Sequence, residues 1–404
     1  MLILFTPLPS ANTGTAAYAA ALLDDLVRNG GEEVRKHVVV AVDSFSSEEQ
    51  GSAARSQGWT VLDFRSVAVA RRDVCAYFLA SNPYHYYCYE QLALQTRGRS
   101  VGIIHDLTAG FMIRELSQFL GSPYCGLLSD AFGHDLGRRS AAILRDYDKV
   151  DDVTKHFINA QGVTLEQCSE LFVHSYYAKA RLALETVAGE EIAERIKVCR
   201  HPAPSRGGAL GIGTAGRRDR SPRLFTAGSL GYYSHIKRFA SVVAGWSAFL
   251  ERYPVCASCE LLLGGSVPDK EKRRLLGLCD ERFRSTIRFV GFLDEDDLHS
   301  TLERLDLLMA LRFPSCGETS GMIAHALAYE TPVAVSEFAA FREEPAAFRI
   351  PVEPEKEVEG LVTALKASFD AWSNGTALAN EQPAWSSNKL SLARCLLRAL
   401  EETN

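Results

Sequence analysis

A single carboxylate, Glu318, stands with Thr319 and Ser320 in a loop that follows the short apolar run at 307–311. A helix is predicted from about Gly321, and a further apolar run after it reads as a strand. The free backbone N–H groups and the positive end of the dipole at that helix start could hold a phosphate. Glu318 itself could bind sugar hydroxyls or stabilise developing positive charge, or it could only complement the dipole.

Two cations, Lys237 and Arg238, lie in the first turn of another predicted helix, after a strand that ends near Gly228. Positive charge in a first turn opposes the helix dipole, so these side chains need a reason to be there. A bound phosphate is one, because a guanidinium can hold it through two hydrogen bonds and an ammonium adds charge. The alternative is a basic turn that is simply solvated.

His105 directly follows the apolar run VGII at 101–104, which reads as a buried strand. Parallel α/β sheets present their ligand-binding residues at the carboxyl ends of the strands. The position of His105, more than its residue type, therefore predicts a functional role. A local hydrogen bond is the alternative.

Glycines follow several of the predicted strands. Gly14 lies between the first strand and the first helix, and Gly264-Gly265 and Gly291-Phe292 end two later strands. Glycine allows a ligand to approach the backbone closely, although each of these could equally be a plain strand-to-loop turn. None of them matches the GxGxxG dinucleotide fingerprint.

The aromatic stretch NPYHYYCYEQLALQ, at 82–95, could present rings to a sugar. Aromatic residues at helical spacing are more typical of a packed helix face, and we favour that interpretation.

Apolar runs and helical patterns alternate along the chain, which is typical of parallel α/β sheets. The strands are predicted at 2–8, 37–42, 59–64, 75–80, 101–104, 171–175, 223–228, 259–265, 286–291, 307–311, 332–336 and 348–352. A stretch rich in glycine and arginine, 206–222, reads as a linker between a domain at 1–205 and a domain at 223–384. A C-terminal helix at 385–404 is expected to complete the first domain. The predicted fold is two doubly wound, Rossmann-like domains facing across a cleft.

The bulk composition is that of an ordinary globular protein. The 404 residues are 47% apolar and 23% charged, with a net charge of −6, so no basic domain argues for nucleic acid as a partner. No apolar run reaches the ~18 residues of a membrane span, and the N-terminus lacks the pattern of a signal peptide. We expect a cytoplasmic protein, and peripheral contact with the inner face of a membrane stays open.

Ten cysteines are scattered along the chain, as is usual for small buried side chains in a reducing compartment. Cys256-Ala-Ser-Cys259 has the spacing of metal ligands but lacks a second pair, so we predict no metal site. Cys316 is the thiol closest to Glu318 in the sequence.

Together these residues resemble the family-4 type of retaining glycosyltransferases (glycosyl transferases group 1), which have the GT-B fold. The resemblance runs over most of the chain and rests on a spaced set of motifs. They are PLPSANTGTAAYAAAL, GIIHDL, FVHSYYAKARL and HPAP in the first half, then FTAGSL, HIKRF, ELLLGG, RFVGFLDEDDL and RFPSCGETSGMIAHALAYETPVAVSE.

The resemblance implies transfer of a sugar from a GDP- or UDP-linked donor to a glycan, glycolipid or other hydroxyl acceptor. It implies retention of the anomeric configuration and no metal or other cofactor. Lys237 and Arg238 would neutralise the departing diphosphate, Glu318 would position the donor sugar, and His105 would line its reacting face. The 1–205 domain would take the acceptor and the 223–384 domain the donor. The further donor-binding residues implied are Gly14, Gly228, Gly264, Gly265, Phe292, Thr319, Ser320, Gly321 and His325.

Three positions depart from the family pattern. His325 stands where a second Glu commonly holds the nucleotide ribose, Glu330 replaces the glycine before TPV, and Ser229 replaces a basic residue. One alternative is therefore a sugar-nucleotide epimerase on the same fold, since a fold does not fix a function. Another is a catalytically silent GT-B module that partners an active enzyme.

Overall fold

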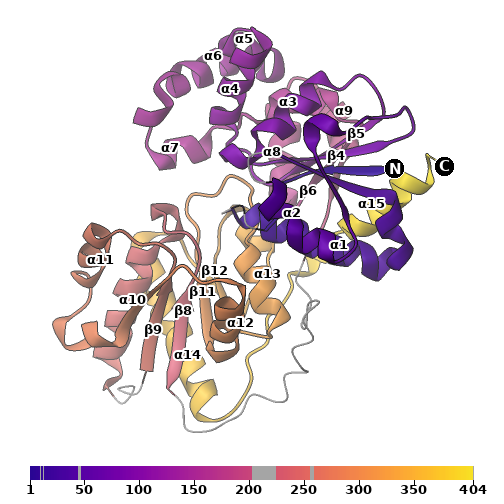
Figure 1. Cartoon of the computed structure of the whole chain (residues 1–404). Coiled ribbons are helices and arrows are strands. Elements are labelled where there is room, and N and C mark those ends of the chain that lie inside the picture. The colour runs from indigo at the N-terminus through magenta and orange to yellow at the C-terminus, as the bar shows by residue number, and fades with distance from the viewer. Residues whose placement is uncertain (10, 12, 44–46, 203–223, 255–258, 404) are drawn as a thin grey trace. The chain divides into compact units, whose positions relative to one another are not determined.

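The computed structural model describes residues 1–9, 11, 13–43, 47–202, 224–254 and 259–403 (Figure 1). The chain forms two compact units. The first comprises Met1–Pro204, Cys316–Gly321 and Asn388–Asn404, and the second comprises Ser205–Ser315 and Met322–Ser387. The predicted linker at 206–222 and Cys256 lie outside the described residues. The segment 316–321 groups with the first unit, although the sequence placed it inside the second domain.

The first unit is built on a parallel sheet of seven strands in the order β3-β2-β1-β4-β5-β6-β7. The strands are β1 (Leu2–Phe5), β2 (Val38–Val42), β3 (Thr60–Asp63), β4 (Val74–Leu79), β5 (Arg99–Ile104), β6 (Glu170–Val173) and β7 (Ile196–Val198). The central strands are continuous apolar runs because both faces of a parallel sheet are covered. In β4, for example, every residue is buried.

Helices cover both faces of this sheet (Figure 1). They are α1 (Gly14–Gly30), α2 (Ser47–Ser56), α3 (Tyr86–Leu94), α4 (Gly110–Leu120), α5 (Tyr124–Phe132), α6 (His134–Ile143), α7 (Asp152–Phe157), α8 (Tyr176–Glu185), α9 (Gly189–Arg195) and α15 (Leu392–Glu401). One core contains α1 and α15, and the other contains α3, α4, α8 and α9. The helix α15 is shorter than the helix predicted at 385–404.

The second unit has a parallel sheet of six strands in the order β10-β9-β8-β11-β12-β13. The strands are β8 (Phe225–Ser229), β9 (Cys259–Gly264), β10 (Ile287–Gly291), β11 (Leu307–Ala310), β12 (Val333–Ser336) and β13 (Phe348–Ile350). The helices are α10 (Phe239–Arg252), α11 (Asp269–Leu276), α12 (Glu295–Arg304), α13 (Gly321–Ala328) and α14 (Pro354–Ser373). A core with α10, α11 and α14 lies on one face, and a core with α12 and α13 lies on the other.

The strands predicted from the sequence are confirmed, and one was missed. That strand, β7, has only three residues, and its central residue is Lys197, so it forms no apolar run. The aromatic stretch at 82–95 is a packed element, because His85, Tyr87 and Tyr89 are buried in the core. Of the helices in the described residues, none combines the length and apolarity required to span a bilayer.

Candidate active site

Four neighbouring strands of the first sheet, β4, β5, β6 and β7, are each followed by a histidine. These are His85, His105, His174 and His201. Because the carboxyl ends of parallel strands share one edge of the sheet, the four rings gather there. The ring centroids of His105 and His174 are 5.9 Å apart, and those of His174 and His201 are 5.6 Å apart. The sequence predicted His105 alone.

Tyr18, from α1, lies in the middle of this histidine cluster. Its ring centroid is 4.5 Å from that of His105 and 4.8 Å from that of His201, both edge to face. Its hydroxyl lies 3.0 Å from His174 Nε2. Tyr18 therefore fixes the spacing of three of the four rings.

The four histidines differ in how their nitrogens are used. His85 Nδ1 lies 2.7 Å from the Phe78 carbonyl and its Nε2 lies 2.6 Å from Thr15 Oγ1. His174 and His201 likewise direct Nδ1 to backbone carbonyls. The Nε2 atom of His105 is buried and has no hydrogen-bond partner among the residues that the structure describes. Nε2 of His105 is therefore not held by a hydrogen bond in the way that Nε2 of His85 and Nε2 of His174 are.

Burial controls the charge of this cluster. It lowers the pKa of His85 to about 4, of His174 to about 3 and of His201 to about 4. The pKa of His105 is lowered well below its usual value by burial and then by the neighbouring histidines. All four rings are therefore neutral at pH 7. No group of three or more His, Cys, Asp or Glu side chains in the described part of the chain is arranged to hold a metal ion.

The loop that carries Glu318 is fixed within the first unit by backbone contacts. Glu318 Oε2 accepts hydrogen bonds from the Cys316 N–H at 2.7 Å and from the Cys316 thiol at 3.1 Å. The Leu107 N–H donates to the Cys316 carbonyl, and Ser175 Oγ donates to the Gly317 carbonyl. Glu318 is therefore held near the carboxyl ends of β5 and β6.

A second carboxylate, Asp106, joins the same hydrogen-bond network. It accepts from the Ser81 N–H and from Thr108 Oγ1, and Thr108 Oγ1 lies 3.7 Å from Cys316 Sγ. Burial, and then the charge of Glu318, raise the pKa of Asp106. Burial and the same carboxylate also raise the pKa of Cys316 well above its usual value. Cys316 is therefore a neutral hydrogen-bond donor and not a thiolate nucleophile.

The carboxyl edge of the second sheet is built from glycine backbone. Gly231, Gly265 and Gly291 follow or end β8, β9 and β10 with φ of 112°, 111° and 75°. The Gly265 N–H donates to the Gly291 carbonyl at 2.6 Å. A Cβ on Gly265 would lie 2.1 Å from the Gly231 carbonyl oxygen. Only glycine fits at position 265, because any side chain would collide with the neighbouring backbone, whereas the space beside Gly291 is open.

The Lys237 ammonium lies against this glycine edge. Lys237 is the last residue of the 3-10 turn His235–Lys237, and a Cβ built on Gly231 would come 2.5 Å from Lys237 Nζ. The sequence named Lys237 and Gly265 but missed Gly231, whose signal was its place three residues after Gly228. Gly228 and Gly264 have other surroundings, because a Cβ on either would meet a core leucine at 2.9 Å and 2.8 Å.

Arg238 has a partner other than the predicted phosphate. Its Nε and Nη2 atoms donate to the two carboxylate oxygens of Glu357, at 3.0 and 2.5 Å. Glu357 lies on α14 and is 1% exposed, so its charge requires this pair. Arg238 also has a φ of 58°, which ends the 3-10 turn ahead of α10. The ion pair explains why a cation occupies this turn.

The remaining predicted residues lie in both units. In the first unit, a Cβ on Gly14 would have open space around it, and one on Gly321 would lie 4.0 Å from the His201 ring. Thr319 and Ser320 precede α13. In the second unit, Phe292 is 61% exposed, and the His325 ring centroid lies 6.1 Å from that of His299.

No protein-family model and no curated protein matches the chain significantly. Solved structures do resemble it. Anabaena HepE, in complex with UDP-glucose, is 14% identical, with a TM-score of 0.55, over 100% of this chain and 99% of its own. A glycosyltransferase from Rickettsia africae is 11% identical, with a TM-score of 0.59, over 100% and 98%. A Listeria monocytogenes protein described as a UDP-N-acetylglucosamine 2-epimerase is 12% identical, with a TM-score of 0.50, over 95% and 91%.

These similarities establish the fold class. The chain has two Rossmann-like α/β domains, with parallel sheets of seven and six strands, of the GT-B type. The fold class predicted from the sequence is confirmed.

Proposed function

We propose that the protein is a glycosyltransferase that moves a sugar from a nucleotide-diphosphate sugar to a hydroxyl acceptor with retention of configuration. The observation that carries this proposal is the glycine edge of the second sheet with the Lys237 ammonium against Gly231. The fold shared with Anabaena HepE, whose structure holds UDP-glucose, and with a Rickettsia glycosyltransferase supports it.

The second unit would bind the donor nucleotide. Gly231, Gly265 and Gly291 carry no side chains that would keep a nucleotide from the backbone, and the space beside Gly291 is open. Lys237 would neutralise the diphosphate as negative charge develops on the leaving group. Arg238 would hold the turn that presents Lys237, through its pair with Glu357. His325 would contact the ribose.

The first unit would supply the groups around the reacting sugar. Glu318, held by Cys316, would accept hydrogen bonds from sugar hydroxyls. Neutral His105 would line the same sugar, and its neutrality avoids a positive charge beside a developing oxocarbenium ion. The acceptor hydroxyl would attack from the face that the diphosphate leaves, and a diphosphate oxygen would take its proton.

The charge of the diphosphate is assigned to Lys237 and backbone N–H groups, so the proposed reaction needs no metal ion or other cofactor. Turnover that is unchanged after EDTA treatment would support this assignment. Turnover that is lost with EDTA and restored by Mg²⁺ or Mn²⁺ would contradict it. We further propose a cytoplasmic enzyme with a glycan or lipid-linked acceptor, working in solution or at the inner face of a membrane.

A sugar-nucleotide epimerase is the second candidate, and the similarity to the Listeria protein favours it. The two reactions differ in one requirement. An epimerase converts its nucleotide sugar without an acceptor, whereas a transferase releases the nucleoside diphosphate and elongates an acceptor.

A panel of UDP- and GDP-sugars tests the proposal on the full chain. We expect at least one donor to raise the melting temperature and to be hydrolysed slowly to the nucleoside diphosphate. Conversion of a donor into its epimer would instead assign the second function. A panel with no stabilising donor would argue for the catalytically silent module.

A further inference from the structure

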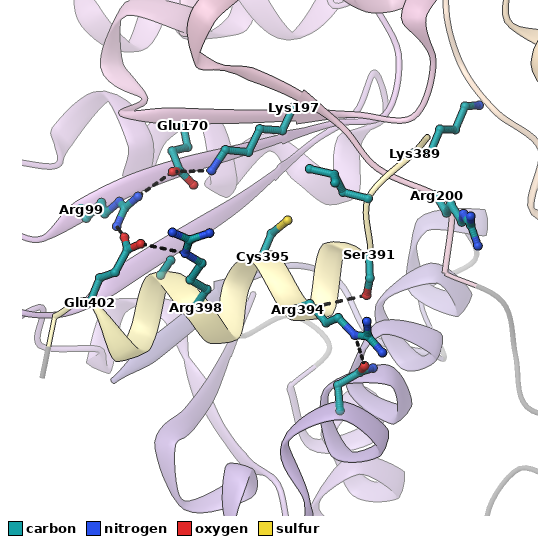
Figure 2. Close-up of a pocket in the computed structure, with 13 residues that line it drawn as sticks. Arg99, Glu170, Lys197, Arg200, Lys389, Ser391, Arg394, Cys395, Arg398 and Glu402 are labelled. Atoms are coloured by element: carbon teal, nitrogen blue, oxygen red, sulfur yellow. Dashed lines mark hydrogen bonds and ion pairs between the residues drawn. The ribbon is translucent and has the colours of Figure 1, made fainter. Parts of the chain in front are cut away.

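A cavity of about 630 Å³ lies in the first unit between the helix α15 and the edge of the sheet at β7 (Figure 2). Arg99 and Glu170, which begin β5 and β6, form part of its wall. His105 and His174 follow the carboxyl ends of the same two strands. This wall therefore lies at the opposite end of these strands from the histidine cluster.

Positive charge is concentrated in the lining of this cavity. Six cations among the described residues line it, which are Arg99, Lys197, Arg200, Lys389, Arg394 and Arg398. The carboxylates among the same described lining residues are Glu170 and Glu402, so this part of the lining has an excess of four positive charges. The whole chain has a net charge of −6, so this excess is local. A concave surface of one sign concentrates its field on counter-ions, which makes it suited to an anion.

Both carboxylates belong to one continuous ion-pair network at one end of the cavity (Figure 2). Glu170 Oε1 accepts from Arg99 at 2.6 Å and from Lys197 at 2.8 Å. Glu402 accepts from Arg99 at 3.0 Å and from Arg398 at 3.1 Å. The negative charge of the lining is thus shared among three cations at this end.

The other end carries Arg200, Lys389 and Arg394. Arg394 Nε donates to the neutral Asn29 Oδ1 at 2.8 Å, which orients the guanidinium without neutralising it. Arg200 N–H donates to the Leu390 carbonyl, and this backbone hydrogen bond joins the segment before α15 to the end of β7. The segment therefore places Lys389 beside Arg200 in the cavity wall.

Two features of α15 face this cavity. Arg394 and Arg398 are four residues apart, so two like charges lie close together on one face of the helix. Cys395 lines the same cavity, and a hydrogen bond from Cys199 is the main reason why its pKa is lowered to about 7; Lys197 and Arg398 add to this shift, and burial and Glu170 oppose it.

We propose that this cavity is a binding site for a compact polyanion that carries phosphate groups. The positive end formed by Arg200, Lys389 and Arg394 would bind one phosphate, and Arg398 would bind a second across the cavity. The anion is either a free phosphorylated metabolite or the phosphorylated headgroup of a lipid. The site is separate from the donor site proposed above and stands or falls independently of it.

The test uses pyrophosphate with the full chain, and Cys395 as a local reporter. Pyrophosphate should slow the alkylation of Cys395 by iodoacetamide at least threefold, while alkylation of the exposed Cys125 stays unchanged. The measurement is repeated with Lys237→Ala, so that binding at the proposed donor site does not enter. The pyrophosphate concentration is raised to 10-fold above the one that stabilises the protein. If Cys395 is still alkylated at the same rate, the proposal is overturned.

A matched pair of double variants provides the second readout. Arg394→Gln with Arg398→Gln should reduce the pyrophosphate affinity at least tenfold, whereas Arg138→Gln with Arg139→Gln, the same charge change on exposed residues of α6, should not. Equal affinity in the two double variants would overturn the proposal.

Vesicles with and without phosphatidic acid separate the two sources of the anion, a lipid headgroup and a free metabolite. If the protein floats with vesicles that contain phosphatidic acid, and the double variant of Arg394 and Arg398 alone does not, the ligand is a lipid headgroup. If pyrophosphate binds but the protein does not float, the ligand is a soluble anion.

Discussion

The carboxyl edges of the two sheets carry different kinds of residue. In the first unit, four strands are followed by histidines, three of which pack against Tyr18, and Asp106 and Glu318 lie at the same edge. In the second unit, Gly231, Gly265 and Gly291 follow or end three strands, and the backbone itself forms the edge. Both edges belong to parallel sheets of the same fold class.

The difference shows that one architecture can present two kinds of surface, which in the proposed function would bind two kinds of ligand group. An edge of neutral, buried side chains offers directional hydrogen bonds to hydroxyl groups at fixed positions. In the proposed function, an edge of glycines would admit a nucleotide to the backbone and leave charge neutralisation to the Lys237 ammonium. The sheet orders are alike, so the chemistry resides in the loops.

Glu318→Gln tests the side-chain edge and should have the largest effect. The amide retains one oxygen for the Cys316 N–H but loses the charge, so turnover should fall by about 10²–10³-fold while the melting temperature changes little. Steady-state kinetics and thermal unfolding measure the two quantities. Full activity would remove Glu318 from the reaction.

Gly265→Ala tests the backbone edge. Its Cβ would collide with the Gly231 carbonyl at 2.1 Å, so the free energy of unfolding should drop by about 3 kcal/mol, with loss of donor binding. Gly291→Ala is the matched control, because its φ of 75° is strained but a Cβ there has open space. The control should lose only about 1 kcal/mol in urea denaturation. Equal losses would mean that strain alone explains the glycines.

The neutral histidines should make the stability of the protein depend on pH. Below pH 6.5 the unfolded chain takes up protons, whereas folded His85 and His201 stay neutral to about pH 4 and His174 to about pH 3. The contribution of these histidines to the unfolding free energy should therefore have its full value above pH 6.5. It should fall as the pH decreases from 6.5 to 4, by roughly 1.4 kcal/mol per pH unit for each histidine.

Denaturation of the parent and of His85→Gln at several pH values checks this slope. The unfolding free energy of the variant should depend less steeply on pH, by the contribution of one histidine, whatever its absolute stability. An unchanged slope would show that His85 takes up its proton at the same pH in the folded and the unfolded chain.

Glu330→Gly should have the smallest effect. Glu330 has a φ of 54°, a backbone conformation in which any side chain is strained. Glycine should relieve this strain, but it also raises the entropy of the unfolded chain, so we expect a net stabilisation of about 0.5 kcal/mol. Glu330→Ala keeps the strain and serves as the control. A glycine variant that is no more stable than the alanine variant would contradict this account.

The fold could be predicted because buried parallel strands read as continuous apolar runs. The strand β7 was missed since Ile196–Val198 forms no such run. The extent of α15 was also overestimated, because a local pattern does not show that Leu390 continues the edge of the sheet beside Cys199 before the helix begins.

The candidate site could be predicted only where one position in the chain was sufficient. His105 was found from its place at a strand end, whereas His85, His174 and His201 become meaningful only when the strand order brings β4, β5, β6 and β7 together. Arg238 illustrates the same limit, because its partner Glu357 lies 119 residues away. Such long-range pairs leave no signal in a single sequence.

The most direct test of the central claim, that Lys237 and the glycine edge hold the donor diphosphate, compares UDP with uridine by calorimetry. The variants are Lys237→Ala and, as a control, Lys356→Ala, whose side chain is 69% exposed on α14. Guanosine and GDP replace uridine and UDP if the donor panel selects a GDP-sugar. We predict that Lys237→Ala weakens UDP at least tenfold and leaves uridine unchanged, and that Lys356→Ala affects neither. UDP that binds Lys237→Ala as tightly as the parent would contradict the account.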